Sequence, residues 1–195
     1  MAELNTLNDL FENELRDVYD AEKQILTALP KIIKAAKDAE LREALTMHLE
    51  ETGGQVERLE QAFASLDLKP KGKHCAGMAG ILEEGSDLLE EEGNDAVLDA
   101  AFIAGCQRVE HYEITAYGTL MAWAKLLGYE EALKLLEANE REEKAADMKL
   151  SKIAESAVNP EAAGAVEVSN DDEEEETPKP ARKISRAAGT KSNMN

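Results

Sequence analysis

Basic side chains are scarce in this 195-residue sequence. It has 22 Lys and Arg residues against 41 Asp and Glu residues, which gives a formal net charge of −19. Affinity for DNA or RNA comes mainly from Lys and Arg side chains that neutralise backbone phosphates. We therefore expect no nucleic acid among the partners of this protein.

Aromatic residues and proline are also scarce. The aromatic fraction is 4% and there are five prolines, whereas the chain has 30 Ala, 30 Glu and 23 Leu residues. This composition favours helices and offers little for the core of a β-sheet. The sequence therefore predicts an all-α protein with one domain of roughly 150 residues and a tail.

The sequence also has only two cysteines and no long apolar run. Cys75 and Cys106 have neither the spacing of a zinc site nor the density of a disulfide scaffold. No stretch approaches the roughly 20 apolar residues that span a bilayer. The N-terminus is acidic from residue 3, unlike a signal peptide. We therefore expect a cytoplasmic protein with reduced cysteines and no membrane contact.

Apolar residues recur at steps of three and four in four long segments, which predicts four helices. The expected ranges are 3–38, 39–67, 95–127 and 130–156. Pro30 lies inside the first range, where we expect a kink. The connection 69–94 is too long for a tight turn and holds at most a short helix at 81–92. Two helical hairpins joined by one long connection form a ferritin-like four-helix bundle.

The C-terminal part of the sequence has no periodic apolar face. Residues 161–176 are small or acidic, and residues 177–195 carry five basic side chains. Such a segment cannot bury enough apolar surface to offset its ordering entropy. We therefore predict a bundle over residues 1–158 and a disordered, acidic-then-basic tail over residues 159–195.

Polar residues interrupt the apolar face of each predicted helix near its middle. In chain order they are Glu22, His48, Glu51, Glu110, Glu113, Glu140, Glu143 and Asp147. Ionised carboxylates in a low-dielectric interior cost several kcal/mol each, so a buried set must be protonated, paired or bound to metal. Lys and Arg are absent from these central positions, so divalent metal ions would compensate the charge most directly.

A short internal repeat supports duplication of the helical hairpin but does not decide which residue of the first helix is a metal ligand. The segment DVYD at 17–20 resembles EHYE at 110–113. The ligand from the first helix is then either Asp17 or Glu22. Asp17 has the better local motif, and Glu22 interrupts the more apolar stripe.

Four segments resemble, in the same order, the YciE/YciF family of ferritin-like stress-response proteins. They read ELRDVYDAEKQILTALPKIIKAA, MHLEETGGQVERLEQAF, EHYEITAYGTLMAWAKLLG and EREEKAADMKLSKIA. The resemblance covers residues 3–157 and implies a stress-response role and a homodimer. The EHYE segment is also similar to the Glu-His-Tyr-Glu run that supplies di-iron ligands in rubrerythrins, and this similarity maps onto Glu110 and Glu113.

The sequence departs from rubrerythrins on the other two ligand helices. The order His48-x-x-Glu51 is the reverse of their Glu-x-x-His, and Glu143-x-x-x-Asp147 contains no histidine. There is also no Cys-x-x-Cys pair for an electron-transfer domain. We therefore do not expect a complete rubrerythrin peroxidase, because the ligands and their surroundings tune a metal's redox behaviour.

The hypothesis from the sequence is a dinuclear metal centre in the bundle core, with two iron ions or, alternatively, manganese. The predicted ligands are Asp17, Glu22, His48, Glu51, Glu110, Glu113, Glu143 and Asp147. One functional hypothesis is oxygen or peroxide chemistry, with Tyr19, Tyr112 or Tyr117 near the metals. The alternative is a non-catalytic structural or partner-binding stress protein whose site is empty or only stabilises the fold. Storage in a ferritin-type shell is a third hypothesis.

Overall fold

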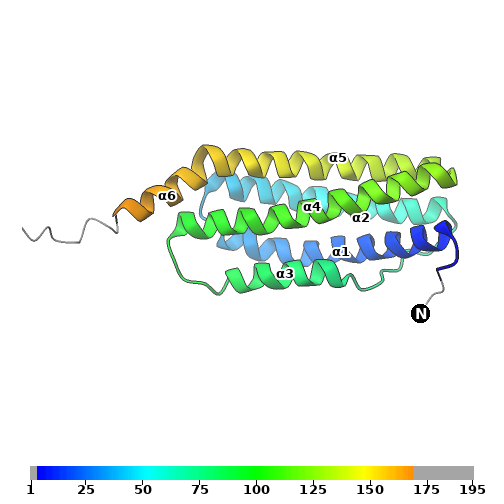
Figure 1. Cartoon of the computed structure of the whole chain (residues 1–195), viewed down its shortest axis with the longest axis horizontal. Helices are drawn as coiled ribbons and strands as arrows, with labels where there is room; N and C mark the ends of the chain where they lie inside the picture. The colour runs from blue at the N-terminus through cyan, green and yellow to red at the C-terminus, as the bar shows by residue number, and fades with distance from the viewer. Residues whose placement is uncertain (1–3, 169–195) are drawn as a thin grey trace, which may run out of the picture.

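Four long helices form a bundle in the computed structural model, which describes residues 4–168 (Figure 1). They are α1 (Leu7–Ala35), α2 (Ala39–Ser65), α4 (Asp95–Leu127) and α5 (Glu130–Ile153). Each packs against two others, in the ring order α1, α2, α5, α4. The described residues contain no strand, and none of their helices is long and apolar enough to cross a membrane. The predicted all-α four-helix bundle is confirmed.

Local sequence fixes where the helices begin and end. The Thr6 hydroxyl accepts the Asp9 N–H at 3.1 Å, and the Asp9 carboxylate accepts the Thr6 N–H at 2.9 Å. This reciprocal pair is a capping box that starts α1. Asp38 and Asn94 cap α2 and α4 through their side-chain oxygens. Gly128 ends α4 at φ 75°, a left-handed conformation that glycine adopts without steric cost.

The observed helix bounds lie close to the expected ranges. Pro30 lies on the exposed side of α1, and the helix continues past it to Ala35. The short helix in the connection begins earlier than expected, since α3 runs Ala76–Leu88 instead of 81–92. Its start is fixed by Cys75, whose sulfur accepts the Met78 N–H at 3.4 Å.

The connection between α2 and α4 runs back along the length of the bundle. Within it, α3 packs against α1 and α4 (Figure 1). Because the chain returns to the end where α2 began, α4 runs in the same direction as α2 and antiparallel to its neighbours α1 and α5. A single long crossover of this kind is the wiring of ferritin-like bundles.

The helical part of the chain extends beyond the expected domain boundary. A π-helical turn, η1 (Ala154–Val158), follows α5 and leads into α6 (Asn159–Val168), which continues past the end of the bundle (Figure 1). Pro160 has no N–H for the preceding turn, and a widened turn is one way in which a helix accommodates such a residue. Residues 159–168, which we expected to be disordered, are therefore helical. The rest of the predicted tail, residues 169–195, lies outside the described residues.

The core consists of two apolar clusters, one toward each end of the bundle. The first includes Leu29, Leu41, Ile103, Leu150 and Ile153. The second includes Phe11, Leu15, Phe63, Tyr117 and Leu136. Along each long helix, the buried residues between these clusters are mostly polar. The fold therefore places a polar layer across the middle of an otherwise apolar core.

Candidate metal centre

Five buried polar side chains, contributed by all four long helices, meet in this middle layer. They are Glu22 from α1, His48 from α2, Glu110 and Glu113 from α4, and Glu143 from α5. We call them the buried centre. None of the five is more than 5% exposed.

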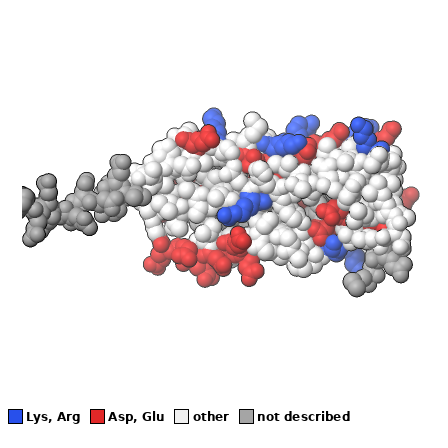
Figure 2. All heavy atoms as spheres, viewed as in Figure 1, with Lys and Arg blue, Asp and Glu red and all other residues white. Residues whose placement is uncertain are grey.

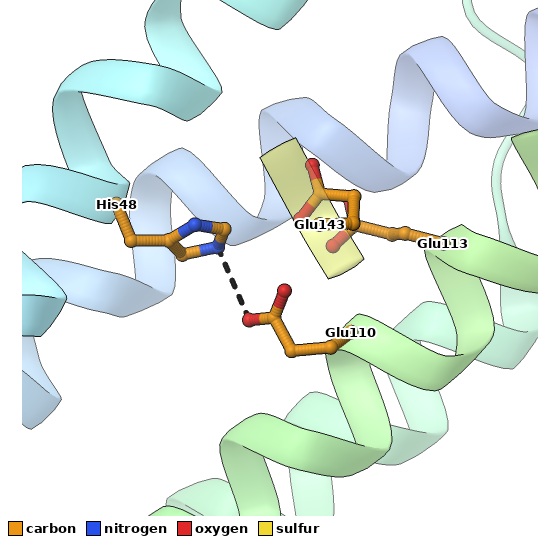
Figure 3. A group of neighbouring side chains, drawn as sticks. All are labelled: His48, Glu110, Glu113 and Glu143. Atoms are coloured by element: carbon orange, nitrogen blue, oxygen red, sulfur yellow. Dashed lines mark ion pairs between the residues drawn. The ribbon is translucent and has the colours of Figure 1, made fainter. Parts of the chain in front are cut away.

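Four members of the buried centre form a compact group. His48, Glu110, Glu113 and Glu143 each offer a ligand atom, and these atoms all lie within 4.8 Å of one another. Figure 3 shows the His48 ring facing the Glu110 carboxylate, with Glu113 and Glu143 beside them. The Nε2 atom of His48 lies 3.3 Å from Oε1 of Glu110. Imidazole and carboxylate groups at this spacing match the ligand set of a borderline transition metal.

Helical spacing explains why α4 supplies two members. Its buried residues include Cys106, Glu110, Glu113 and Tyr117, which follow one another at steps of four, three and four. Residues at these steps lie on one side of an α-helix. The side of α4 that faces the bundle axis is therefore apolar at both ends and acidic in the middle.

Most polar atoms of the buried centre have no hydrogen-bond partner among the described residues. This holds for both nitrogens of His48 and both oxygens of Glu113 and of Glu143, and for Oε2 of Glu22 and of Glu110. Buried polar groups in proteins are nearly always hydrogen-bonded. The buried centre therefore presents ligand atoms that only protons, water or a cation would satisfy.

Asp99 is a buried carboxylate outside the buried centre, and its oxygens have hydrogen-bond partners. It is 2% exposed, like the glutamates of the buried centre. Its oxygens accept the Lys37 N–H at 3.0 and 3.2 Å and the Asp38 N–H at 2.6 Å. These bonds fasten α4 to the turn between α1 and α2. The contrast shows that burial of a carboxylate does not by itself leave its oxygens unpartnered.

The crowding of carboxyl groups makes them hard to ionise. Burial raises the pKa of Glu22 to about 7 and that of Glu110 to about 8. Burial, reinforced by repulsion from neighbouring carboxylates, raises the pKa values of Glu113 and Glu143 well above their ordinary value. Burial lowers the pKa of His48, but the surrounding carboxylates outweigh it and raise that pKa overall.

A hydrogen-bond chain connects the buried centre to the outside of the bundle. The Tyr117 hydroxyl donates to Oε1 of Glu22 and accepts from Nδ2 of Asn139 at 2.9 Å. The Asn139 carbonyl in turn accepts from Nε of Arg58, which also pairs with Glu142. Because Arg58 can only donate, it fixes the orientation of the Asn139 amide. The Asn139 amide donates to the Tyr117 oxygen. The Tyr117 hydroxyl proton is therefore free to point toward Glu22.

Asp17 does not join the buried centre. Its carboxylate forms an ion pair with Nζ of Lys73 at 3.0 Å and accepts a hydrogen bond from the Tyr112 hydroxyl at 3.0 Å. The same Tyr112 oxygen lies 2.9 Å from Sγ of Cys75. Of the two alternatives for the first helix, the structure brings Glu22 together with the other candidates and places Asp17 against the crossover.

Two further candidates on α5 lie beside the centre. The Asp147 carboxylate accepts from Nε2 of Gln107 at 3.0 Å and lies 3.4 Å from Nε2 of His111. Glu140 pairs with Lys144 at 2.7 Å. The sequence pattern followed 140, 143 and 147, whereas the buried line of α5 runs 136, 139, 143 and 150. The pattern was therefore off by one residue before Glu143, at 140 instead of 139, whereas Asp147 follows the three- and four-residue steps from Glu143 to Leu150 but is only partly buried.

Glu51 occupies the edge of the buried centre. Its side chain is 41% exposed, and its Oε2 atom lies 3.8 Å from Nδ1 of His48. The neighbouring His48 imidazole lowers the pKa of Glu51, in contrast to the buried glutamates. Glu51 is therefore the one candidate carboxylate that contacts both the centre and solvent.

The sequence hypothesis missed Asn139 and Arg58. Asn139 is fully buried on α5, one residue from the stripe that the pattern followed. A buried amide one turn before Glu143 would have been visible with the correct helical phase. Arg58 gave no signal, because its role depends on contacts 81 and 84 residues away along the chain.

Comparison with known proteins places this chain in an existing family. A family model described as "Domain of unknown function (DUF892)" matches residues 6–163. The chain is 45% identical to Protein YciF of Escherichia coli over 160 residues, which is 82% of this chain and 96% of YciF. These matches confirm the resemblance drawn from the four sequence segments.

Solved structures share the fold over nearly their whole length. The E. coli stress protein YciF matches with a TM-score of 0.77 at 45% identity, over 80% of this chain and 99% of that one. YcfI from Rhodopseudomonas palustris, described as a structural protein, gives 0.76 at 47% identity, over 78% and 97%. A protein from Xanthomonas campestris shares the fold alone, with a TM-score of 0.64 at 17% identity.

The raised carboxyl pKa values predict an unusual pH dependence for the metal-free protein. Between the ordinary value of 4.5 and about 8, the folded chain retains protons at Glu22 and Glu110 that the unfolded chain has released. These groups therefore make the free energy of unfolding fall as pH rises through this window. Urea denaturation across this pH range measures the slope, and Glu22→Gln with Glu110→Gln should flatten it. A free energy of unfolding that rises with pH equally in both proteins would contradict the assignment.

The hydrogen-bond chain predicts that Tyr117 stabilises the fold through its hydroxyl. Tyr117→Phe removes the shorter of the two hydrogen bonds that the Asn139 amide donates and the donor to Oε1 of Glu22, so the free energy of unfolding should fall by about 1–3 kcal/mol. Tyr129→Phe is the matched control, because the hydroxyl of Tyr129 donates to Asn8 at an exposed position. That control should change stability by no more than about 0.5 kcal/mol. Equal effects of the two substitutions in urea denaturation would refute the network.

Proposed function

The chain belongs to the DUF892 family, and we propose that its buried centre binds two divalent transition-metal ions. Iron is the first choice and manganese the alternative. The observation that carries the proposal is the set of nitrogen and oxygen ligand atoms that are buried, close together and unpartnered. A mixed set with several carboxylates and one imidazole suits these metals.

Charge balance supports two ions. The buried centre contains the four carboxylates of Glu22, Glu110, Glu113 and Glu143, which carry −4 when ionised. Two divalent cations carry +4, and His48 would then act as a neutral ligand. No Lys or Arg is buried among the described residues. A cation would also displace the protons that burial retains, because metal ligands must be deprotonated.

The residues around the ligands have identifiable roles in this proposal. His48, Glu110, Glu113 and Glu143 would hold the ions, with Glu22 completing the set. The Tyr117 hydroxyl fixes one oxygen of Glu22 and leaves Oε2 free to act as a ligand. Such outer partners orient a ligand and raise metal affinity. The apolar clusters at both ends of the bundle limit water around the centre.

Beyond metal binding, we propose that the protein carries out oxygen or peroxide chemistry in a stress response. Two iron ions would supply the electrons for reduction of O₂ or peroxide. The description of E. coli YciF as a stress protein supports this role. The description of YcfI as a structural protein favours the second candidate, in which the bound metal only stabilises the bundle. The chain's own buried tyrosine, Tyr117, lies within one hydrogen bond of a ligand, which favours redox chemistry.

We also propose a homodimer in the cytoplasm, as the resemblance to the family implies. Large apolar side chains on the surface of the bundle support association with a second copy. They include Met47 at 48%, Leu126 at 77% and Met148 at 71% exposure. Light scattering of the purified protein decides the oligomeric state.

The proposal predicts metal binding that depends on Glu143 and not on its neighbour. Purified protein should bind two Mn(II) or Fe(II) ions per chain, and metal at about 100 times Kd should raise the free energy of unfolding by about 2.7 kcal/mol for each ion. Glu143→Gln should weaken binding by more than the roughly 10–100-fold expected for loss of an outer partner. Calorimetric titration and elemental analysis measure both effects.

Glu140→Gln is the matched control, one turn away on the same helix and paired with Lys144. It should retain the wild-type stoichiometry and affinity. Because Glu143→Gln removes a buried carboxyl, its metal-free form should unfold at no lower urea concentration than the wild type. Metal-free wild-type protein whose stability does not change when Fe(II) or Mn(II) is added would refute the proposal.

A second prediction separates redox chemistry from structural metal binding. Iron-loaded protein should change its optical absorption when mixed with O₂ or hydrogen peroxide, and Glu113→Gln should abolish that change while the helical circular dichroism persists. Asp147→Asn is the control, because Asp147 lies beside the buried centre. Bound iron whose spectrum neither oxidant alters would establish the structural candidate instead.

A further inference from the structure

We propose that a small apolar cavity beneath α3 is a binding site for dioxygen at the edge of the buried centre. The inference rests on the proposed function, which it deepens by naming the side from which an apolar molecule reaches the metals. It concerns residues outside the ligand set, and part of its test needs no metal.

The cavity lies between α1, α3 and α4 and has a volume of about 30 Å³. Its walls include Ile25, Leu29, Ile81, Leu82, Phe102 and Val109. At its inner end it reaches His48 and Glu110, two members of the buried centre. The cavity therefore joins the half-buried inner side of α3 to the proposed ligands.

The size and lining of the cavity indicate which kind of molecule fits it. One water molecule needs roughly 10–15 Å³ of such space, so the cavity has room for about two atoms of that size, which is a diatomic molecule. Apart from the two ligands at its inner end and Cys106, its walls are formed by aliphatic and aromatic side chains and two glycines. Apolar cavities in proteins stay dry and take up apolar molecules such as xenon.

A second, larger opening leads to the same two ligands and has charged side chains among its apolar lining. It lies between α2 and α5, has a volume of about 220 Å³, and is lined by Glu51 and Lys149 as well as by His48 and Glu110. Ions and polar molecules that enter here can interact with the charged side chains of Glu51 and Lys149. Metal ions and peroxide therefore have a polar route, and the cavity beneath α3 is not needed for them.

The outer side of α3 is acidic. Figure 2 shows acidic side chains gathered over the C-terminal half of α3 and the turn that follows it. The exposed acidic residues there are Glu83, Glu84, Asp87, Glu90, Glu91 and Glu92. This charge repels anions and exerts little force on an uncharged diatomic molecule. Both the surface and the lining on this side thus favour dioxygen over ionic oxidants.

Two glycines on opposite walls keep the cavity open. Gly85 on α3 and Gly105 on α4 both line it. A Cβ atom added at either position would meet no other atom within 4 Å. A larger side chain at Gly105 would therefore occupy the cavity without a clash at its first carbon, and it would raise helix propensity.

The first experiment measures occupancy of the cavity by xenon in metal-free protein. Wild-type crystals or solutions under xenon pressure should show xenon between Ile25, Leu82 and Val109. Gly105→Leu should abolish that signal. Gly80→Leu is the matched control, because Gly80 is an exposed glycine of α3 with equally open surroundings. Absence of xenon from the wild type, or equal uptake by the Gly105→Leu variant, would overturn the proposal.

The second experiment measures reaction rates of iron-loaded protein. Gly105→Leu should slow the optical change produced by O₂ about tenfold, equivalent to about 1.4 kcal/mol in the barrier. The same variant should react with hydrogen peroxide at the wild-type rate, because the opening between α2 and α5 is unchanged. An unaltered O₂ rate in the filled variant would overturn the proposed route.

The two experiments also separate this inference from the proposed function. Iron stoichiometry is measured in the wild type, Gly105→Leu and Gly80→Leu before the oxidant is added. If none of them binds iron, the proposed function fails, and xenon alone decides whether the cavity takes small apolar molecules. If all bind iron equally and only the O₂ rate falls in Gly105→Leu, both proposals stand.

Discussion

The electrostatic cost of burying carboxyl groups is the constraint on which the rest of this structure depends. Glu22, Glu110, Glu113 and Glu143 lie together between two apolar clusters, where they have almost no contact with solvent to stabilise their charge. Such a group persists only with protons or cations, because an isolated ionised carboxylate in the interior costs several kcal/mol. Every long helix contributes to the set, so the compensation of this charge is coupled to the packing of the whole bundle.

The crossover and the outer hydrogen bonds arrange the surroundings of the buried centre. Because α3 covers α1 and α4, one side of the centre is lined mainly by apolar residues. The opposite side, between α2 and α5, carries Glu51 and Lys149. The chain from Arg58 through Asn139 and Tyr117 fixes Glu22 from a third direction. Each side of the centre thus meets a different chemical environment.

Helical periodicity was sufficient to predict the fold. It indicated four long helices and one long crossover, and the range predicted for α4, 95–127, agrees with the structure. The helix at Asn159–Val168 was missed, because a proline after a run of small residues normally ends a helix. Periodicity detects apolar faces well and detects small-residue helices poorly.

Periodicity also identified the five members of the buried centre, since each interrupts an apolar stripe. It could not separate them from Glu140, which lies one position off the buried line of α5, or from Asp147, which is only partly buried and contacts Gln107 and His111. It could not choose between Asp17 and Glu22, because that choice depends on Lys73 and Tyr112, which come from distant segments. Sequence spacing gives the height of a residue along a helix, whereas its partners depend on tertiary packing.

Anomalous diffraction from crystals soaked in Mn(II) would test the central proposal most directly. Data collected on both sides of the manganese absorption edge locate the metal without assumptions about the ligands. The proposed centre predicts two anomalous peaks among His48, Glu110, Glu113, Glu143 and Glu22. Manganese peaks at exposed carboxylates only, with none among these five side chains, would contradict it.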